Sequence, residues 1–142
     1  LIEMFPKVDW IEEEDFASQL LDIIEFSSDF ILWGVDDVLY FDMVDLKPHV
    51  DLLNEDRSIL CSHLRLSPNI TYCHPADSFS KLPKFTPFSP SSVDLENEIL
   101  LFNRKQGSND WNYPFELCAT LMRKVFYLLK TNSLARHLVD FR

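Results

Sequence analysis

Residues 30–37 read FILWGVDD, an apolar run that is followed directly by a pair of aspartates. The apolar part is too short for a typical helix and has no polar face to offer to solvent. It therefore predicts a central strand, Phe30–Val35, that is buried on both faces of a sheet. A segment with helical periodicity precedes it, and a helix followed by a buried strand predicts a layered α/β fold with helices flanking the sheet.

The preceding helix is expected to run from about Trp10 to Phe26. Asp9 is the candidate N-cap, and the glutamates at 12–14 would complement the helix dipole in the first turn. Further along the chain, the patterns predict a short helix or turn at 47–54 with Pro48 near its start, strands at 58–66 and 99–102, a polar turn at 106–113 and a last helix at 116–131.

Residues 67–92 hold most of the chain's eight prolines together with several serines, which predicts a long Pro/Ser-rich loop. Prolines remove backbone donors, and the segment lacks periodic apolar residues, so we expect 74–92 to be poorly ordered without a ligand. Because the whole chain has 142 residues and 46% hydrophobic residues, it is expected to be a single domain, 1–142, or the C-terminal portion of one.

The chain is acidic, with 13 Lys and Arg against 23 Asp and Glu and a formal charge of −10. This charge repels polyanions, so nucleic acid is not expected as a partner. A small anionic ligand could still bind if a divalent cation lay between its phosphates and the protein carboxylates. The two glycines stand apart, so no Gly-rich phosphate loop is present.

The three cysteines form no CxxC pair and predict neither a disulfide framework nor a thiolate zinc site, so buried apolar thiols are expected. No apolar run approaches the roughly 20 residues of a membrane span, and no signal peptide opens the chain. The expectation is a soluble protein, with a cytoplasmic location favoured.

The aspartate pair is the sharpest chemical feature. Hard cations such as Mn²⁺ or Mg²⁺ take oxygen ligands, and ligands in open α/β sheets gather beyond the carboxyl ends of strands. In an extended chain Asp36 and Asp37 point to opposite faces, so one of them is expected to contact a metal while the other bonds nearby backbone. The alternative is an Asp-Asp turn that merely ends the strand.

Three blocks of sequence resemble one enzyme family. They are FILWGVDDVLY at 30–40, LRLSPNITYC at 64–73 and DWNYPFEL at 110–117. In this order and spacing they resemble nucleotide-diphospho-sugar glycosyltransferases of the GT-A type, in which an apolar strand carries a DxD-like acidic motif to a divalent ion on the donor diphosphate. The resemblance implies a GT-A-like fold, a nucleotide-sugar donor and an acceptor that the sequence does not identify.

Applied to this sequence, the resemblance makes Asp37 the metal ligand and Asp36 the acid near the donor ribose or the same ion. It implies Mn²⁺ or Mg²⁺ as the cofactor. Position 35 is valine, so strict Asp-x-Asp spacing is absent. A histidine late in the chain is a common metal ligand in this family, which makes His137 a minor candidate; the other histidines are expected in surface or packing roles.

The third block implies a loop on the sugar or acceptor side. There Asp110 is the candidate catalytic carboxylate that binds a hydroxyl, and Trp111 and Tyr113 would contact the sugar. The alternative is that both aromatic side chains anchor a turn on the core. Arg65 is suited to bidentate binding of a donor phosphate or carboxylate, and its alternative is an internal salt bridge.

Two hypotheses follow for the function. The first is a metal-dependent glycosyltransferase. The second is a catalytically inactive GT-A-like domain used for binding. Few residues precede the acidic pair, so most of the nucleotide-binding half that the resemblance implies is expected to be absent from this sequence. In addition, residues 118–120 read CAT where the family often has an acid, a glycine and a histidine. Both features favour the second hypothesis.

Overall fold

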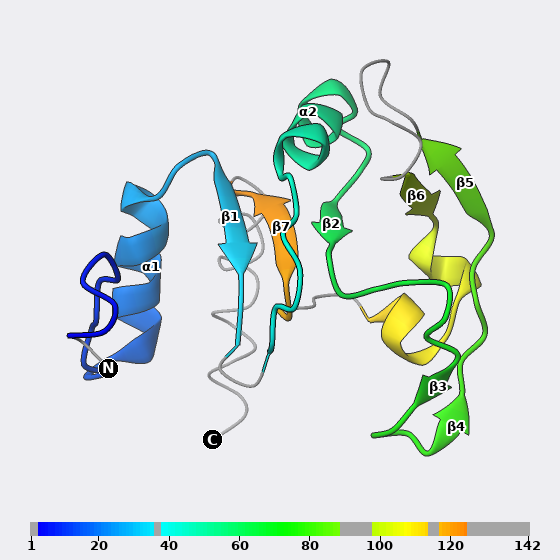
Figure 1. The fold of residues 1–142 in the computed structure, drawn as a ribbon, viewed down its shortest axis with the longest axis horizontal. Helices are drawn as coiled ribbons and strands as arrows, with labels where there is room; N and C mark the ends of the chain where they lie inside the picture. Colours follow the sequence, from blue (N-terminus) through cyan, green and yellow to red (C-terminus); the bar gives the residue numbers. More distant parts are fainter. Residues whose placement is uncertain (1–2, 36–37, 89–97, 114–116, 125–142) are drawn as a thin grey trace.

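The computed structural model describes residues 3–35, 38–88, 98–113 and 117–124. It is a mixed α/β structure with small antiparallel sheets and two α-helices in the described part (Figure 1). In chain order the elements are α1 (Phe16–Phe26), β1 (Phe30–Trp33), α2 (Lys47–Glu55), β2 (Cys61–His63), β3 (Tyr72–Cys73), β4 (Ser78–Phe79), β5 (Phe85–Phe88), β6 (Ile99–Phe102), the 3₁₀ helices η2 (Arg104–Gln106) and η3 (Asn109–Asn112), and β7 (Thr120–Arg123).

The main sheet has the strand order β1-β7-β2, and both neighbouring pairs are antiparallel. Ile31 lies opposite Met122 in one pair, and Ser62 lies opposite Leu121 in the other. All four residues of β7 are buried. The strand nearest the C-terminal end of the described chain is therefore the centre of this sheet.

This topology corrects two predictions. The apolar run at Phe30–Val35 was predicted to be a central strand buried on both faces, but β1 is an edge strand among the described residues, and Leu32 is 40% exposed. The last helix was predicted at 116–131, but Thr120–Arg123 is a strand. Sheet pairing with distant residues overrides the local helical periodicity there. Residues 114–116 and 125–142 lie outside the described residues.

Helix α1 begins later than predicted because Asp15, rather than Asp9, is its N-cap. The Asp15 carboxylate accepts hydrogen bonds from the Ser18 hydroxyl at 2.8 Å and the Ser18 backbone N–H at 3.5 Å. The Gln19 side chain reaches back to accept from the backbone N–H groups of Glu14 and Asp15. These contacts satisfy donors that the helix itself leaves without partners.

The core lies between α1 and the main sheet. Ile24 of α1 packs on Met122 of β7, and partly buried apolar residues surround this contact: Leu20, Ile31, Trp33 and Cys61. Helix α2 packs against β2 and β7 and buries Leu52 and Leu53. The predicted packing of helices on a sheet is confirmed for both helices.

The predicted Pro/Ser-rich loop at 67–92 contains three short strands in its described part, so the prediction of an irregular segment is wrong there. β3 pairs with β4 in a small hairpin, and β5 pairs with β6. Pro87 is tolerated in β5 because this strand has β6 as a partner on one side only among the described residues. Residues 89–97 lie outside the described residues.

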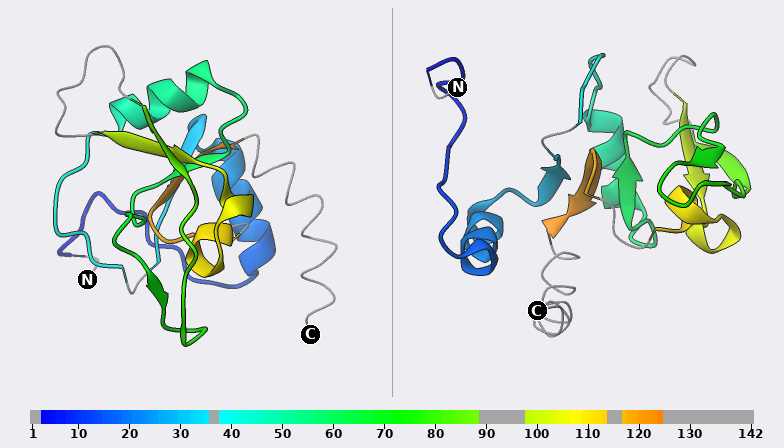
Figure 2. Two further views of the ribbon diagram at one scale, coloured as in Figure 1. Left: turned by 90° about the vertical axis from the view of Figure 1, so that its right-hand side faces the viewer. Right: turned by 90° about the horizontal axis from the view of Figure 1, so that it is seen from below.

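Figures 1 and 2 show α1 at one end of the molecule and the β5–β6 sheet with η2 and η3 at the other end, with the main sheet between them. Among the described residues, no helix combines the length and the apolar character that are needed to cross a membrane.

Candidate functional site

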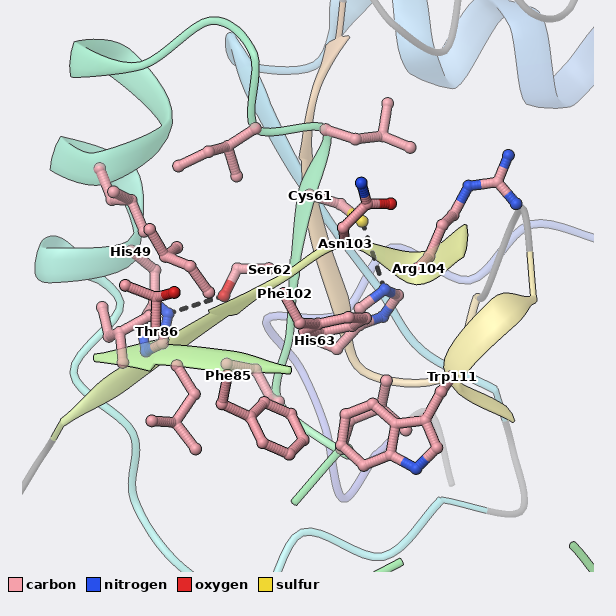
Figure 3. A pocket seen from close by; sticks show the side chains of 18 of the residues that line it. His49, Cys61, Ser62, His63, Phe85, Thr86, Phe102, Asn103, Arg104 and Trp111 are labelled. Carbon is pink, nitrogen blue, oxygen red and sulfur yellow. Dashed lines mark hydrogen bonds between the residues drawn. The ribbon is translucent and has the colours of Figure 1, made fainter. Parts of the chain in front are cut away.

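A cavity of about 1030 Å³ lies between the main sheet and the β5–β6 sheet. Residues of α2, β2, β5, β6 and the two 3₁₀ helices line it, as seen from close by in Figure 3. Ligand sites of drug or cofactor size typically have volumes of roughly 300 to 1,000 Å³. The cavity is therefore large enough for a nucleotide or a short sugar chain.

One wall of the cavity is an aromatic cluster of Phe85, Phe102 and Trp111. The indole ring lies edge-on to both phenyl rings, with its centroid 5.2 Å from each of theirs. Trp111 is only 2% exposed, and its Nε1–H donates a hydrogen bond of 2.9 Å to the carbonyl oxygen of Ile70. In this structure Trp111 anchors η3 on the core, which is the alternative that the sequence left open for it.

Tyr113 differs from Trp111 in its exposure to solvent. It also lines the cavity, but 59% of the residue is exposed. Its ring and hydroxyl group are therefore accessible to a ligand, whereas Trp111 presents little free surface. Of the two aromatic candidates, Tyr113 is better placed to contact a bound sugar.

The structure brings two other candidates together. The guanidinium group of Arg65 lies 3.2 Å from the carboxylate of Asp110, and their side chains are 30% and 21% exposed. Asp110 lines the cavity. The internal salt bridge that the sequence offered as the alternative for Arg65 is therefore present, and it fixes the candidate catalytic carboxylate at the cavity wall.

Asp36 and Asp37, the predicted metal site, lie outside the described residues, and so does His137. In the described ranges, no group of three or more His, Cys, Asp and Glu side chains is arranged to hold a metal ion.

Two histidines that the sequence assigned to surface or packing roles face the cavity. The Nδ1 atom of His49 lies 2.8 Å from the Ser62 hydroxyl. Burial lowers the pKa of His49 below its ordinary value of 6.5, and the nearby charge of Asp45 opposes this shift. Burial in the fold therefore favours the neutral form of the His49 imidazole.

His63 is part of a chain of polar contacts that sequence reasoning missed. Its Nε2 atom lies 3.4 Å from the sulfur of Cys61, and its Nδ1 atom lies 2.9 Å from the Thr120 hydroxyl (Figure 3 marks the first contact). The signal was present in the sequence, because residues two apart in a strand share one face. Cys61 and His63 have this spacing in a segment that was predicted to be a strand.

Comparison with known proteins relates this chain to glycosyltransferases. The chain is 33% identical over 127 residues to the bifunctional glycosyltransferase pgtA of Dictyostelium discoideum. The match covers 87% of this chain and 16% of pgtA, so the chain spans a small part of that relative's length. No family model matches the chain, and no solved structure matches it.

The comparison supports the expected relationship to a glycosyltransferase, over a stretch that makes up 16% of that relative. The comparison does not show that the chain has a GT-A fold, so the GT-A type stays a prediction. The catalytic, donor-binding and metal-binding roles of individual residues also stay predictions.

Proposed function

We propose that this chain forms part of the substrate-binding region of a metal-dependent glycosyltransferase, which transfers a sugar from a nucleotide-diphosphate donor to an acceptor hydroxyl. The observation that carries the proposal is the 33% identity to a bifunctional glycosyltransferase over 87% of the chain. The size of the cavity and its mixed aromatic and polar lining support it, since a sugar offers both apolar ring faces and hydroxyl groups.

In the proposed reaction, the acceptor oxygen attacks the anomeric carbon of the donor sugar, and the bond from that carbon to the diphosphate breaks. The nucleoside diphosphate leaves with the electron pair, and the acceptor's proton passes to Asp110. Arg65 holds the Asp110 carboxylate at the cavity wall, 3.2 Å from its own guanidinium group. Positioning of this kind lowers the barrier by converting a bimolecular step into a step between groups already in place.

Asp37 and Asp36 are proposed to hold Mn²⁺ or Mg²⁺, since carboxylate oxygens are the ligands that hard cations prefer. Such an ion would neutralise charge on the departing diphosphate. Tyr113, which is exposed at the cavity, is proposed to contact the sugar.

The test is an assay of nucleoside diphosphate release by the full-length protein. The protein is incubated with Mn²⁺ and a panel of nucleotide-diphosphate sugars, with simple sugars supplied as acceptors. We expect release above the protein-free rate with at least one donor, and a loss of about 100-fold in Asp110→Asn, the lower end of the range for general acid–base catalysis. Asp22→Asn, which alters an exposed carboxylate on α1, is the control and should match the wild type.

A binding domain without catalytic activity is the second candidate. Two observations favour it: the Asp110 carboxylate is already paired with Arg65, and Trp111 is enclosed by Phe85 and Phe102. Under this alternative, sugars or nucleotide sugars would bind without any release of nucleoside diphosphate, and Asp110→Asn would change affinity alone.

A further inference from the structure

Cys61 and His63 lie on one face of β2, and the pairing of β2 with β7 places Thr120 directly opposite His63. The imidazole ring is thus held from both sides, by the Cys61 sulfur 3.4 Å from Nε2 and by the Thr120 hydroxyl oxygen 2.9 Å from Nδ1. A nucleophile, a base and a third group that orients the base are the parts of an activated nucleophile.

The contacts of Thr120 favour one tautomer of His63. The Thr120 hydroxyl donates to the backbone carbonyl of Cys118 at 3.3 Å, so its single proton is directed away from the ring. The Nδ1–H group of His63 then donates to the Thr120 oxygen, which leaves the lone pair of Nε2 directed at Cys61. In this tautomer His63 can accept the thiol proton of Cys61.

The pair is open to small molecules. Cys61 and His63 both line the cavity, and Cys61 is half-buried, whereas Cys73 is 8% exposed and lies on β3, away from the main sheet. Thr120 is fully buried in the central strand, so its position is fixed by the sheet. Reactive cysteines are typically found partly exposed and close to a group such as an imidazole, and Cys61 meets both conditions.

We propose that Cys61, His63 and Thr120 form a nucleophilic thiol site that undergoes thiol–disulfide exchange with small disulfides entering the cavity. The Cys61 proton moves to Nε2 of His63, and the thiolate attacks one sulfur of the disulfide. The new bond joins that sulfur to Cys61, the old S–S bond breaks, and the other half leaves as a thiolate. Cys61 is the reacting residue, His63 is the base, and Thr120 is a positioning residue. The reactivity is independent of the sugar-transfer proposal.

The experiment measures the reaction of the full-length protein with the aromatic disulfide dithiobis(nitrobenzoate), by the colour of the released thiolate and by peptide mapping of the labelled cysteine. We expect Cys61 to be labelled first, before Cys73 and Cys118. Because an ordinary cysteine is only a few per cent thiolate at neutral pH, removing the base in His63→Gln should slow labelling by about tenfold. Thr120→Val keeps the shape of the side chain and should slow labelling less, while His74→Gln, on an exposed turn outside the cavity, should leave the rate unchanged.

The pH profile of the labelling rate gives a reading that a purely structural role of His63 would not move. The wild type should keep a fast rate at pH values where an ordinary cysteine is protonated, and His63→Gln should lose this rate and follow the profile of an ordinary cysteine. If His63→Gln fails to fold, the order of labelling in the wild type decides by itself. Labelling of Cys118 or Cys73 before Cys61, or a folded His63→Gln that reacts as fast as the wild type, would overturn the proposal.

Discussion

The guanidinium group of Arg65 lies 3.2 Å from the carboxylate of Asp110, 45 residues further along the chain. This ion pair joins the segment after β2 to η3 at the wall of the cavity. It links the two charged residues that the sequence singled out for phosphate binding and for catalysis. The same contact can stabilise the fold and position a catalytic carboxylate, so the two roles have to be separated by experiment.

The contribution of this ion pair to stability can be measured with a double-mutant cycle of Arg65→Gln and Asp110→Asn. Both side chains are partly exposed, and pairs of this kind contribute roughly 0.5 to 1 kcal/mol after solvent screening. We therefore expect urea denaturation to give a coupling free energy of this size. The losses of stability in the two single variants should then add up to more than the loss in the double variant. Fully additive effects would show that the contact contributes nothing to folding.

Trp111→Phe should destabilise the protein by about 2 kcal/mol or more. The substitution removes the hydrogen bond to the Ile70 carbonyl and leaves a gap between Phe85 and Phe102. Tyr113→Phe is the matched control, because Tyr113 is 59% exposed, and it should change the free energy of unfolding by less than about 0.5 kcal/mol. Equal effects in urea denaturation would contradict the assignment of Trp111 as the core anchor.

The two glycines make a second matched pair. A Cβ atom at Gly107 would lie 2.5 Å from the Cβ of Trp111 and 3.2 Å from the carbonyl oxygen of Lys81. We expect Gly107→Ala to cost about 1 to 3 kcal/mol by overpacking. At Gly34 the nearest atom would be the Tyr40 hydroxyl at 3.4 Å, an ordinary contact, so Gly34→Ala should cost little. If Gly107→Ala leaves the free energy of unfolding unchanged in urea denaturation, Gly107 has more room beside Trp111 and Lys81 than these distances indicate.

The buried position of His49 predicts a pH dependence of stability. Burial lowers its pKa in the folded state below 6.5, so just below pH 6.5 the unfolded chain binds a proton that the folded chain does not. The contribution of His49 to stability is therefore complete above pH 6.5 and is lost as the pH falls through that value toward the lowered pKa. Urea denaturation across this range should show a steeper loss in the wild type than in His49→Asn. Identical slopes would contradict the shift.

The local elements were predicted best where the signals are local. Pro48 near the start of α2 and the apolar run of β6 gave the right element types, with α2 ending at Glu55 rather than 54 and β6 as predicted. The strand β7 was missed because its partners, Ile31 and Ser62, are far away in the sequence, and periodicity within one segment carries no information about distant pairing. Because β7 lies between β1 and β2, β1 is an edge strand of this sheet among the described residues.

The sequence was enough to name candidate residues for the site, but it did not show which of them contact one another. Arg65 was expected to pair with some acid of the chain, but nothing in one sequence shows that Asp110 is that acid. Trp111 was left between two roles, and only the enclosing rings of Phe85 and Phe102 decide for packing. The pair of Cys61 and His63 could have been read from strand alternation, whereas the contribution of Thr120 depends on the sheet register.

The central claim, that the chain serves a metal-dependent glycosyltransferase, is tested most directly by the melting midpoint of the full-length protein with nucleotide sugars and Mn²⁺. A ligand at about a hundred times its Kd stabilises the native state by about 2.7 kcal/mol, which predicts a rise of roughly 5 °C or more for at least one donor. Asp37→Asn should abolish the rise, because asparagine keeps the shape but removes the charge that a hard cation requires. Asp42→Asn is the control, since Asp42 is exposed and its carboxylate accepts a hydrogen bond from the neighbouring Met43 N–H. The account would be contradicted if none of the donors raised the melting midpoint of the wild type. It would also be contradicted if Asp37→Asn and Asp42→Asn responded alike.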